Sequence, residues 1–417
     1  MLDKTSLLAG SARFDLCGAC SQAAGGRQRS VDDRWIYPAA LPDGRTIRLL
    51  KVLQTNVCTK DCQYCENRAS RDVRRESFSP EELAKLFLSL HRADKAGGLF
   101  LSSGVAGRAD TVMARMIATA EILRRRHRFH GYIHMKILPG ASRAAIERAA
   151  QLSNRISINL EAPGPGRLER IAGEKDFLRE LLPQTEWIQQ VVADPKTRAN
   201  SHTTQFVVGA SGESDREILK WTDWLYKGRG LYRAYYSAYE VPDEDTRLDA
   251  PPTPLMREHR LYQSDFLLRK YGFGLDELVF EGTGDLSLKV DPKERWAQEH
   301  AEWFPVEILT APQELLLRVP GLGPVSAKRI CSWRRQNGLR GPDDLRKAGL
   351  VLKKAAPYLL LKGKPLPIQP SQLALPFSSD SPIPSLAGDL QITPGSNVQV
   401  TGARRWLRVP WPRRCTG

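Results

Sequence analysis

The chain has 417 residues, enough for two or more domains, one of them with a sizeable core. With 41% hydrophobic and 26% charged residues its composition is that of an ordinary soluble protein, and the absence of any run of about 18 apolar residues excludes a transmembrane helix. The net charge of +15 favours a polyanionic partner, although a generally solvated basic surface would give the same total.

Residues 1–45 form a predicted N-terminal extension, polar and rich in Gly and Ala, without clear periodicity. Its short apolar stretch at residues 7–10 is too brief for a secretory signal, so we expect a cytoplasmic protein. The extension contains a Cys-Gly-Ala-Cys sequence, Cys17 to Cys20.

From residue 46 to residue 250, apolar runs of strand length alternate with segments of helical periodicity. The expected strands are Leu49–Leu53, Leu99–Ser102, Tyr132–Leu138, Ile156–Leu160, Gln205–Val208 and Tyr232–Tyr239. The expected helices are Pro80–Arg92, Asp110–Arg126, Ser142–Leu152 and Glu213–Tyr226. This alternation predicts right-handed βαβ units, hence an α/β fold with a parallel sheet or partial (β/α)6 TIM-like barrel. The long connection at residues 162–203 is expected to carry its own helices, with residues 174–182 as a candidate, and could serve as a lid.

Three of the seven cysteines, Cys58, Cys62 and Cys65, fall within eight residues directly after the first expected strand. Their spacing is C-x3-C-x2-C, and carboxyl ends of strands are where α/β proteins form their sites. Three thiolates can each hold one iron of a cubane, leaving the fourth iron open to a small molecule. Two alternatives remain: a zinc site completed by Cys17 and Cys20, or buried thiols without metal.

The cysteine spacing, with Tyr64 directly before the last cysteine, resembles the radical S-adenosylmethionine (SAM) superfamily. The resemblance implies a [4Fe–4S] cluster on these cysteines with SAM bound at its open iron. It further implies an electron donor and reductive cleavage of SAM to a 5′-deoxyadenosyl radical that abstracts hydrogen from a substrate.

Positions at the ends of later strands resemble cofactor-binding motifs of that superfamily. Ser103 and Gly104 lie where the superfamily has Gly-Gly-Glu; the glutamate is absent here, so only backbone contacts carry over. Asn159 and Glu161 resemble an Asn-x-Asp/Glu strand, whose two polar residues face the same side because they are two positions apart.

Gly209 and Gly212 resemble the glycine-rich turn on the adenine side. The predicted cofactor contacts are therefore Tyr64, Ser103, Gly104, Asn159, Glu161, Gly209 and Gly212, with no catalytic residue assigned. Residues 134–136 and 235–237 fit a substrate cavity and plain barrel core equally well.

Three further regions follow the predicted radical SAM core of residues 46–250. A proline-rich boundary at residues 251–254 opens a helical connection, residues 251–311, with expected helices at Leu255–Tyr271 and Lys293–Trp303. Residues 312–364 form a compact basic domain, predicted to be all-α. Residues 365–417, with nine prolines, are expected to be disordered.

The basic domain contains Pro320-Gly321-Leu322-Gly323, which resembles the turn of a helix-hairpin-helix. The resemblance implies that Gly321 and Gly323 let backbone N–H groups approach a DNA phosphate, that Leu322 anchors the turn, and that Lys328 and Arg329 lie in the first turns of the next helix. Residues 318–364 hold twelve Lys or Arg and only two Asp, which favours DNA binding without sequence reading over a protein-docking hairpin. Residues 347–354 resemble a second hairpin that lacks its second glycine.

Gln372–Phe377 in the tail resembles the hexapeptide by which bacterial proteins bind the replication sliding clamp. Over residues 10–364, the cysteine loop followed by a helix-hairpin-helix resembles a family of DNA modification or repair radical SAM proteins, associated with a partner similar to uracil-DNA glycosylase. This implies an enzyme acting on a base or sugar of DNA, which must be flipped or unstacked if it comes from a duplex. The alternatives are an RNA-modifying enzyme of the same chemistry and a non-catalytic iron–sulfur scaffold or redox sensor on DNA.

Overall fold

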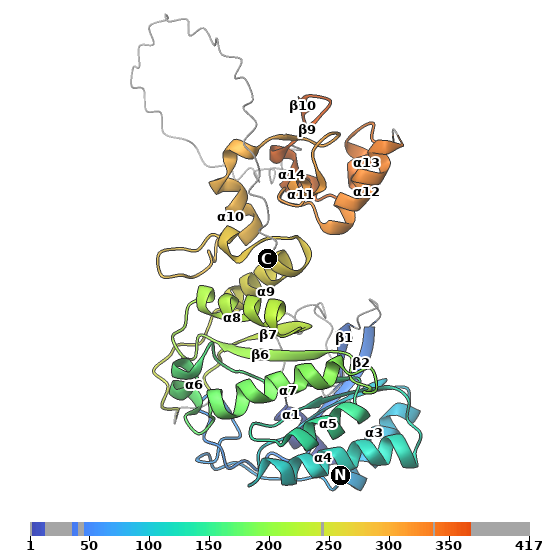
Figure 1. Cartoon of the computed structure of the whole chain (residues 1–417), viewed down its shortest axis with the longest axis vertical. Helices are drawn as coiled ribbons and strands as arrows, with labels where there is room; N and C mark the ends of the chain where they lie inside the picture. The colour runs from blue at the N-terminus through green and yellow to red at the C-terminus, as the bar shows by residue number, and fades with distance from the viewer. Residues whose placement is uncertain (1, 13–35, 41–45, 243–245, 337, 368–417) are drawn as a thin grey trace, which may run out of the picture. The chain divides into compact units, whose positions relative to one another are not determined.

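A sheet of parallel strands dominates the computed structural model, which describes residues 2–12, 36–40, 46–242, 246–336 and 338–367 (Figure 1). Six strands are mutually parallel and each lies beside its neighbour in sequence: β2 (Thr46–Leu53), β3 (Gly98–Ser102), β4 (Tyr132–Lys136), β5 (Arg155–Ser157), β6 (His202–Val208) and β7 (Arg233–Ala238). An order without reversal is what successive right-handed βαβ units produce, and six strands close only part of a barrel. The predicted α/β fold with a partial (β/α)6 barrel is confirmed.

Residues 1–45 contain two elements that the sequence did not predict. Strand β1 (Ile36–Ala40) pairs antiparallel with β2 at the edge of the sheet, and helix α1 (Leu2–Gly10) contacts β2. Both are short, and β1 carries Pro38, which is tolerated on an edge strand but hides its pattern. Cys17 and Cys20 lie outside the described residues.

Helices follow the strands along the chain. They are α3 (Pro80–Arg92), α4 (Ala109–Glu121) continued by the π-helix η3 (Ile122–Arg126), α5 (Arg143–Leu152), α6 (Pro165–Ala172), the π-helix η4 (Phe177–Leu181), α7 (Leu182–Ala193) and α8 (Asp215–Gly228). The predicted start of α3 is confirmed as a capping box: Ser79 Oγ accepts from the Glu82 amide at 3.1 Å, and the Glu82 carboxylate accepts from the Ser79 amide at 2.7 Å. The 162–203 connection does carry helices of its own, α6, η4 and α7.

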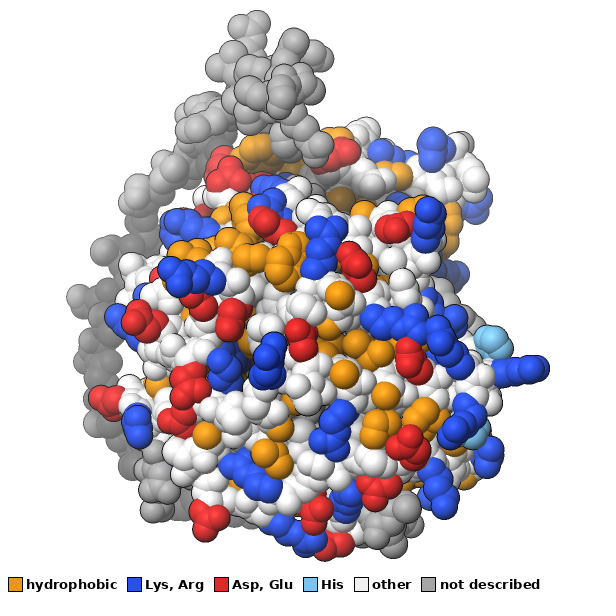
Figure 2. All heavy atoms as spheres, turned by 60° about the horizontal axis from the view of Figure 1, so that its bottom comes forward, with side chains coloured by type: hydrophobic (Ala, Val, Ile, Leu, Met, Phe, Trp, Pro, Cys, Tyr) orange, Lys and Arg blue, Asp and Glu red, His pale blue; other side chains and the backbone are white. Residues whose placement is uncertain are grey.

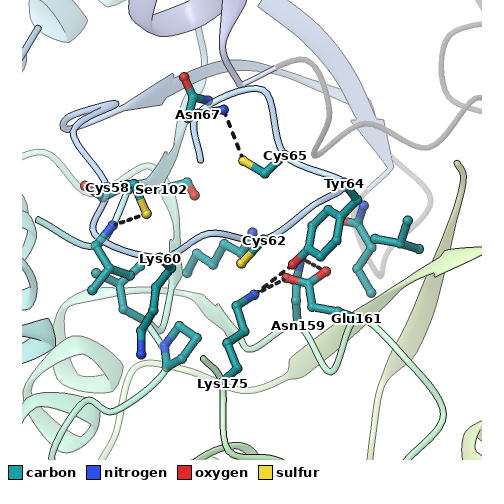
Figure 3. A pocket seen from close by; sticks show the side chains of 18 of the residues that line it. Cys58, Lys60, Cys62, Tyr64, Cys65, Asn67, Ser102, Asn159, Glu161 and Lys175 are labelled. Atoms are coloured by element: carbon teal, nitrogen blue, oxygen red, sulfur yellow. Dashed lines mark hydrogen bonds and ion pairs between the residues drawn. The ribbon is translucent and has the colours of Figure 1, made fainter. Parts of the chain in front are cut away.

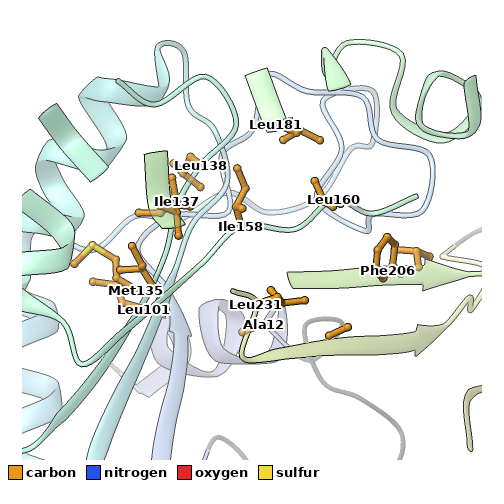
Figure 4. Close-up of a cluster of buried hydrophobic side chains, with 14 of the residues drawn as sticks. Ala12, Leu101, Met135, Ile137, Leu138, Ile158, Leu160, Leu181, Phe206 and Leu231 are labelled. Carbon is orange, nitrogen blue, oxygen red and sulfur yellow. The ribbon is translucent and has the colours of Figure 1, made fainter. Parts of the chain in front are cut away.

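The main core lies between the sheet and these helices (Figure 4). Side chains alternate across each strand, so Ile156 and Ile158 point into this core while Ser157 faces the other side. That other, inner face carries polar side chains on several strands, among them His134, whose Nε2 lies 2.9 Å from Ser157 Oγ. The inner face is therefore better suited to binding a polar ligand than to packing against a hydrophobic layer.

The C-terminal part begins with helices α9 (Leu255–Lys270), η5 (Leu275–Glu277), α10 (Pro292–Glu299) and η6 (Ala301–Trp303). A module with its own hydrophobic core follows; its elements are β8 (Val306–Glu307), α11 (Gln313–Leu316), α12 (Pro324–Arg335), α13 (Pro342–Lys347), α14 (Leu352–Ala355), η7 (Ala356–Tyr358), β9 (Leu359–Leu361) and β10 (Lys364–Pro365).

The expectation of an all-α C-terminal module needs one correction. Strands β8, β9 and β10 form a small sheet in the order β10-β9-β8. Strands of two or three residues give no alternating pattern that sequence analysis could find. They also bring residues on both sides of the predicted boundaries, at 306–307 and 364–365, into one sheet.

Two surface features bear on the partner expected from composition. None of the helices in the described ranges is long and apolar enough to cross a membrane. Figure 2 shows Lys and Arg side chains mixed with Asp and Glu over the face that it draws, so the positive charge is spread over that face rather than gathered in one field.

Candidate functional site

A pocket opens at the carboxyl ends of the strands and is lined by the cysteine loop (Figure 3). The side chains of Cys58, Cys62 and Cys65 lie around one open space within it. Every parallel strand from β2 to β7 contributes residues at or just beyond its carboxyl end to the wall. The fold thus brings together residues that are up to 229 positions apart in sequence, from Ser11 to Glu240.

The three thiols lie in a largely buried loop in which backbone amides donate to two of the sulfur atoms. Cys62 is buried, and burial raises the pKa of its thiol. Burial, with the neighbouring Cys62, also raises the pKa of Cys65 to about 12. The Val105 amide donates to Cys58 Sγ and the Asn67 amide donates to Cys65 Sγ, each at 3.4 Å. Such N–H···S contacts stabilise thiolate ligands once metal has displaced the protons.

The cysteine loop is fixed by backbone contacts on two sides. Gly104 packs so closely that a Cβ there would lie 2.4 Å from the Val57 carbonyl oxygen, so only glycine fits. Arg75 donates from both terminal nitrogens to four backbone carbonyls, those of Asn56, Asn67, Arg68 and Arg71, at 2.6–2.9 Å. The loop that positions the cysteines is consequently rigid before any ligand binds.

The donor set fits a cubane better than a single metal ion. Among the described residues, no group of three His, Cys, Asp or Glu side chains comes close enough together to hold one ion. A cubane does not need such convergence, because each cysteine binds a different iron atom. The three thiols around one space, with no fourth thiol of the described residues lining the same pocket, match a [4Fe–4S] cluster with one open iron.

A buried network extends from this loop to the end of β5. Lys175 Nζ donates to Tyr64 Oη at 2.8 Å and to Glu161 Oε1 at 3.1 Å, and Asn159 Nδ2 lies 3.4 Å from Glu161 Oε2. The side chains of Lys175 and Glu161 are only 8% and 6% exposed. Burial alone would lower the pKa of Lys175, but the negative charges of Cys62 and Glu161 raise it above its usual value. The ammonium therefore remains charged and joins the cysteine loop to the sheet.

Asn159 and Glu161 face the same pocket, as predicted, but not because they lie on a regular strand. Strand β5 ends at Ser157, and Glu161 has a left-handed backbone with φ +65°. Its amide and carbonyl are held by the backbone of Gln205 and Val207 at 3.0 and 2.8 Å. Such a conformation costs roughly 1–2 kcal/mol in an L-residue and is typical of positions where function fixes the side chain.

Five of the seven predicted cofactor contacts line the pocket: Tyr64, Ser103, Gly104, Asn159 and Glu161. Gly209 and Gly212 do not. The amides of Gly209 and Ser211 donate to the Glu213 carboxylate at 2.5 and 3.1 Å, and a Cβ on Gly209 would lie 2.0 Å from Thr253 Oγ1. In this structure the turn is organised by its own glutamate, and contact with the cofactor stays a prediction for both glycines.

Sequence reasoning missed several pocket residues. Lys60 and Lys175 lie in loops whose positions depend on tertiary packing, and Gln205 lies within a strand that reads as fully buried. For the two segments left open by the sequence, Lys136 and Ser237 line the pocket, whereas the other residues of both segments do not. Because side chains alternate along a strand, the sequence could have singled out Lys136 and Ser237 if it had shown which face of the sheet lines the pocket.

The residues predicted to contact DNA lie together at one turn of the C-terminal module. Gly321 has φ +75°, Leu322 is 1% exposed, and Gly323 is the N-cap of α12 without a capping side chain. Lys328 and Arg329 are exposed on that helix. The positions agree with a turn that offers backbone N–H groups, while contact with DNA stays a prediction.

A comparison with protein families identifies the first part of the chain. Residues 52–225 match the family model described as the Radical SAM superfamily. Residues 52–225 form a radical SAM domain. Domains of this superfamily belong to enzymes that use a [4Fe–4S] cluster and SAM, so the expected enzyme class and cofactors are confirmed for this domain. The match covers less than half of the chain and does not include the C-terminal module.

Solved structures show only a distant likeness to the chain. The FeFe-hydrogenase maturase HydG from Carboxydothermus hydrogenoformans is 15% identical over 53% of this chain and 51% of its own, with a TM-score of 0.41. A radical SAM methyltransferase from Sphaerobacter thermophilus is 14% identical over 63% of this chain and 80% of its own, with a TM-score of 0.42. The matched region spans about half the length of the maturase. No curated protein sequence matches the chain.

Proposed function

We propose that the protein is a radical SAM enzyme that modifies or repairs DNA. The observation that carries the proposal is the presence, in one chain, of the cysteine-lined pocket and of a basic module with two glycine turns. When bound, the [4Fe–4S] cluster supplies one electron that cleaves SAM into methionine and the 5′-deoxyadenosyl radical.

Each group of pocket residues has a separate task in this proposal. Cys58, Cys62 and Cys65 hold the cluster, and the Lys175–Glu161 pair positions Asn159 at the cofactor. The pocket walls hold cofactor and substrate next to each other, so that the radical forms beside the bond it attacks. Substrate enters from the inner face of the sheet, where the polar side chains lie.

The proposal that DNA is the substrate is supported by how the two glycine turns pack. Val351 donates to the Gly321 carbonyl at 3.0 Å, and Ser326 Oγ donates to the Gly349 carbonyl at 2.9 Å. Gly349 has φ +93° and is followed by the buried Leu350, as Gly321 is followed by Leu322. Two similar turns packed against each other are suited to contact the backbones of both strands of a duplex, which gives affinity without sequence reading.

Anaerobic reconstitution with iron and sulfide, followed by reduction in the presence of SAM, tests the chemistry. We expect 5′-deoxyadenosine from the wild-type protein and none from Cys58→Ala, Cys62→Ala or Cys65→Ala, which also lose their bound iron. Cys331→Ala, in the C-terminal module, is the matched control and should keep both. Zinc in place of iron, or iron retained in the three variants, would overturn the proposal.

Duplex DNA binding tests the substrate class. Lys328→Gln and Arg329→Gln should each lower the slope of log affinity against log salt by about 0.9, as expected for one lost phosphate contact. Tighter binding of transfer RNA than of duplex DNA would favour the RNA-modifying alternative. A cluster that binds DNA but yields no 5′-deoxyadenosine would favour the scaffold or sensor.

The remaining partners are part of the same proposal. An electron donor must reduce the cluster, and a protein similar to uracil-DNA glycosylase would act on the same DNA. The clamp-like hexapeptide Gln372–Phe377 lies outside the described residues. Co-purification with the sliding clamp from wild type but not from a chain ending at residue 367 would support its recruiting role.

A further inference from the structure

The inner face of the sheet continues below the cofactor pocket towards the amino ends of the strands. On β7, Ser237 lines the pocket, and Tyr235 and Arg233 lie on the same face because side chains alternate. On the β5 side, Asn159 lines the pocket and Arg155 belongs to the same face as Ser157. Arg233 is four residues from Ser237, and Arg155 is four residues from Asn159. Four residues of strand span about 13 Å, which is comparable to the length of one or two nucleotides.

Arg155 is a buried cation that has no counter-ion among the described residues. It is 5% exposed, and its single hydrogen bond among the described residues runs from Nε to Ser201 Oγ at 3.0 Å. Its guanidinium carbon lies 4.7 Å from the centre of the Tyr232 ring. No carboxylate of the described chain pairs with it, although an uncompensated buried charge is costly.

Arg233 repeats this pattern on β7. Its Nε is buried and has no hydrogen-bond partner in the described part of the chain. The guanidinium carbon lies 5.0 Å from the centre of the Tyr235 ring and 5.6 Å from that of Tyr262. No carboxylate of the described residues pairs with Arg233 either.

Other arginines with buried guanidinium groups in this chain are satisfied internally. Arg257 pairs with Asp215 at 2.8 Å, and Arg318 makes bonds to both carboxylate oxygens of Glu277 at 2.7 and 2.9 Å. Arg260, which is 7% exposed and has no carboxylate partner in the described part of the chain, still makes three hydrogen bonds, to the Ser287 and Leu288 carbonyls and to Gln263 Oε1, at 2.8–3.0 Å. Arg155 and Arg233 differ in that, among the described residues, they have neither a carboxylate nor such a set of hydrogen bonds.

Aromatic rings surround the two cations. Tyr132, on β4, is close enough to Arg155, Tyr232 and Tyr235 for all three to influence it: burial raises its pKa to about 12, and Arg155 opposes that rise. Tyr232 is 40% exposed, so one ring of the group remains accessible. Guanidinium groups beside aromatic faces are the combination by which proteins bind a phosphate together with a stacked base.

We propose that this part of the inner face binds the phosphate of a nucleotide, with Arg155 and Arg233 as the anion-binding groups and Tyr132, Tyr232 and Tyr235 as the stacking surface. The assignment rests on the proposed function, because it places part of a nucleic-acid substrate beside the radical-generating pocket. The phosphate comes either from a strand whose target nucleotide occupies the pocket or from a free nucleotide.

Equilibrium titration of the full-length, cluster-loaded protein under anaerobic conditions tests the site, and the assay needs no SAM cleavage. The probes are deoxyadenosine 5′-monophosphate, deoxyadenosine and a short single-stranded oligonucleotide. Wild type should bind the monophosphate at least about tenfold more tightly than the nucleoside. Arg155→Met and Arg233→Met should each remove about tenfold of the affinity for the monophosphate and leave that for the nucleoside unchanged. Lys220→Met, at an exposed position of α8, should change neither.

Thermal unfolding without ligand provides a second readout. Because neither arginine has a counter-ion in the described ranges, Arg155→Met and Arg233→Met should leave the melting temperature unchanged or raise it. Both variants should abolish its increase with monophosphate. A lower melting temperature or failure to fold would assign the arginines a structural role and overturn the proposal, as would equal monophosphate binding by variants and wild type. The oligonucleotide separates the two sources: tighter binding than the monophosphate, lost in the same variants, indicates a strand. If the wild-type protein forms no 5′-deoxyadenosine but still binds the monophosphate through both arginines, the proposed function is overturned and the phosphate site is not.

Discussion

Two buried lysines, one in each half of the molecule, show how the partner of a cation decides its charge. Lys175 at the cofactor pocket donates to Glu161, whereas Lys293 on α10 donates to the Leu322 carbonyl at 2.5 Å, within the turn of the C-terminal module. Both are nearly inaccessible, with the Lys175 side chain 8% and Lys293 8% exposed. Lys175 has a raised pKa, while burial, with a contribution from Arg318, lowers the pKa of Lys293 to about 7.

The difference follows from the charges around each ammonium: Cys62 and Glu161 oppose the effect of burial at Lys175, whereas Arg318 adds to it at Lys293. A carboxylate stabilises an ammonium strongly at short range, while a carbonyl dipole only partly replaces lost hydration. The barrel therefore keeps a permanent positive charge beside the cysteine loop. At the turn of the C-terminal module, by contrast, the ammonium of Lys293 loses its proton near neutral pH, although the nearby Asp291 favours the charged form.

The largest effect is expected at the barrel lysine. Lys175→Met should lower the free energy of unfolding by about 3–5 kcal/mol, because it leaves the Glu161 carboxylate buried without its cation. Urea unfolding of the cluster-free protein under reducing conditions measures the loss.

Adding Glu161→Gln to the Lys175→Met variant tests whether the unpaired carboxylate causes the loss of stability. The double variant Lys175→Met/Glu161→Gln should recover most of the stability, since no uncompensated charge remains. Equal losses in the single and double variants would mean that the lysine acts by packing, and the comparison of the two lysines would fail.

Much of the barrel half could be predicted from sequence because its signals are local. The strand and helix alternation, the capping box at Ser79 and the cysteine spacing are all readable within about ten residues. Lys175 could not be found in this way, since it is one of two lysines in the 162–203 connection and nothing in the sequence shows that it reaches Glu161 and Tyr64. Arg155 and Arg233 were equally hidden, because an arginine at the start of a strand usually faces solvent.

The module half was predicted less completely for a related reason. Its turn at Gly321 is marked by glycine and proline, so its location was readable. The sheet β10-β9-β8 was missed because it joins residues 306–307 with residues 359–365, a pairing determined by tertiary packing alone.

An intermediate effect should arise from a side chain at the turn that Lys293 supports. A Cβ on Gly321 would lie 2.8 Å from the Val351 carbonyl oxygen, and φ is +75°, so Gly321→Ala adds a steric conflict to backbone strain. We expect a loss of about 2–3 kcal/mol in the free energy of unfolding. Gly363→Ala is the matched control, because φ there is +74° and nothing lies within 4 Å; it should lose only about 1 kcal/mol. Equal losses would show that the two glycine turns do not depend on close packing.

The smallest change in stability at neutral pH is expected for Lys293→Met, which leaves no buried carboxylate behind. Its informative readout is pH dependence. The folded state binds the Lys293 proton with a pKa of about 7, and the unfolded state with the ordinary lysine value, so the unfolded state holds more protons throughout the interval between them. The free energy of unfolding must then rise with pH, and integration gives a gain of about 2 kcal/mol for wild type between pH 7 and pH 9.

Lys293→Met should remove most of this gain in urea unfolding. Lys354→Met is the control and should retain it, because that ammonium is half exposed and paired with Asp291 at 2.9 Å. A wild-type stability that is flat over this range would mean that Lys293 stays charged when folded, and the contrast between a carboxylate and a carbonyl as partner would not hold.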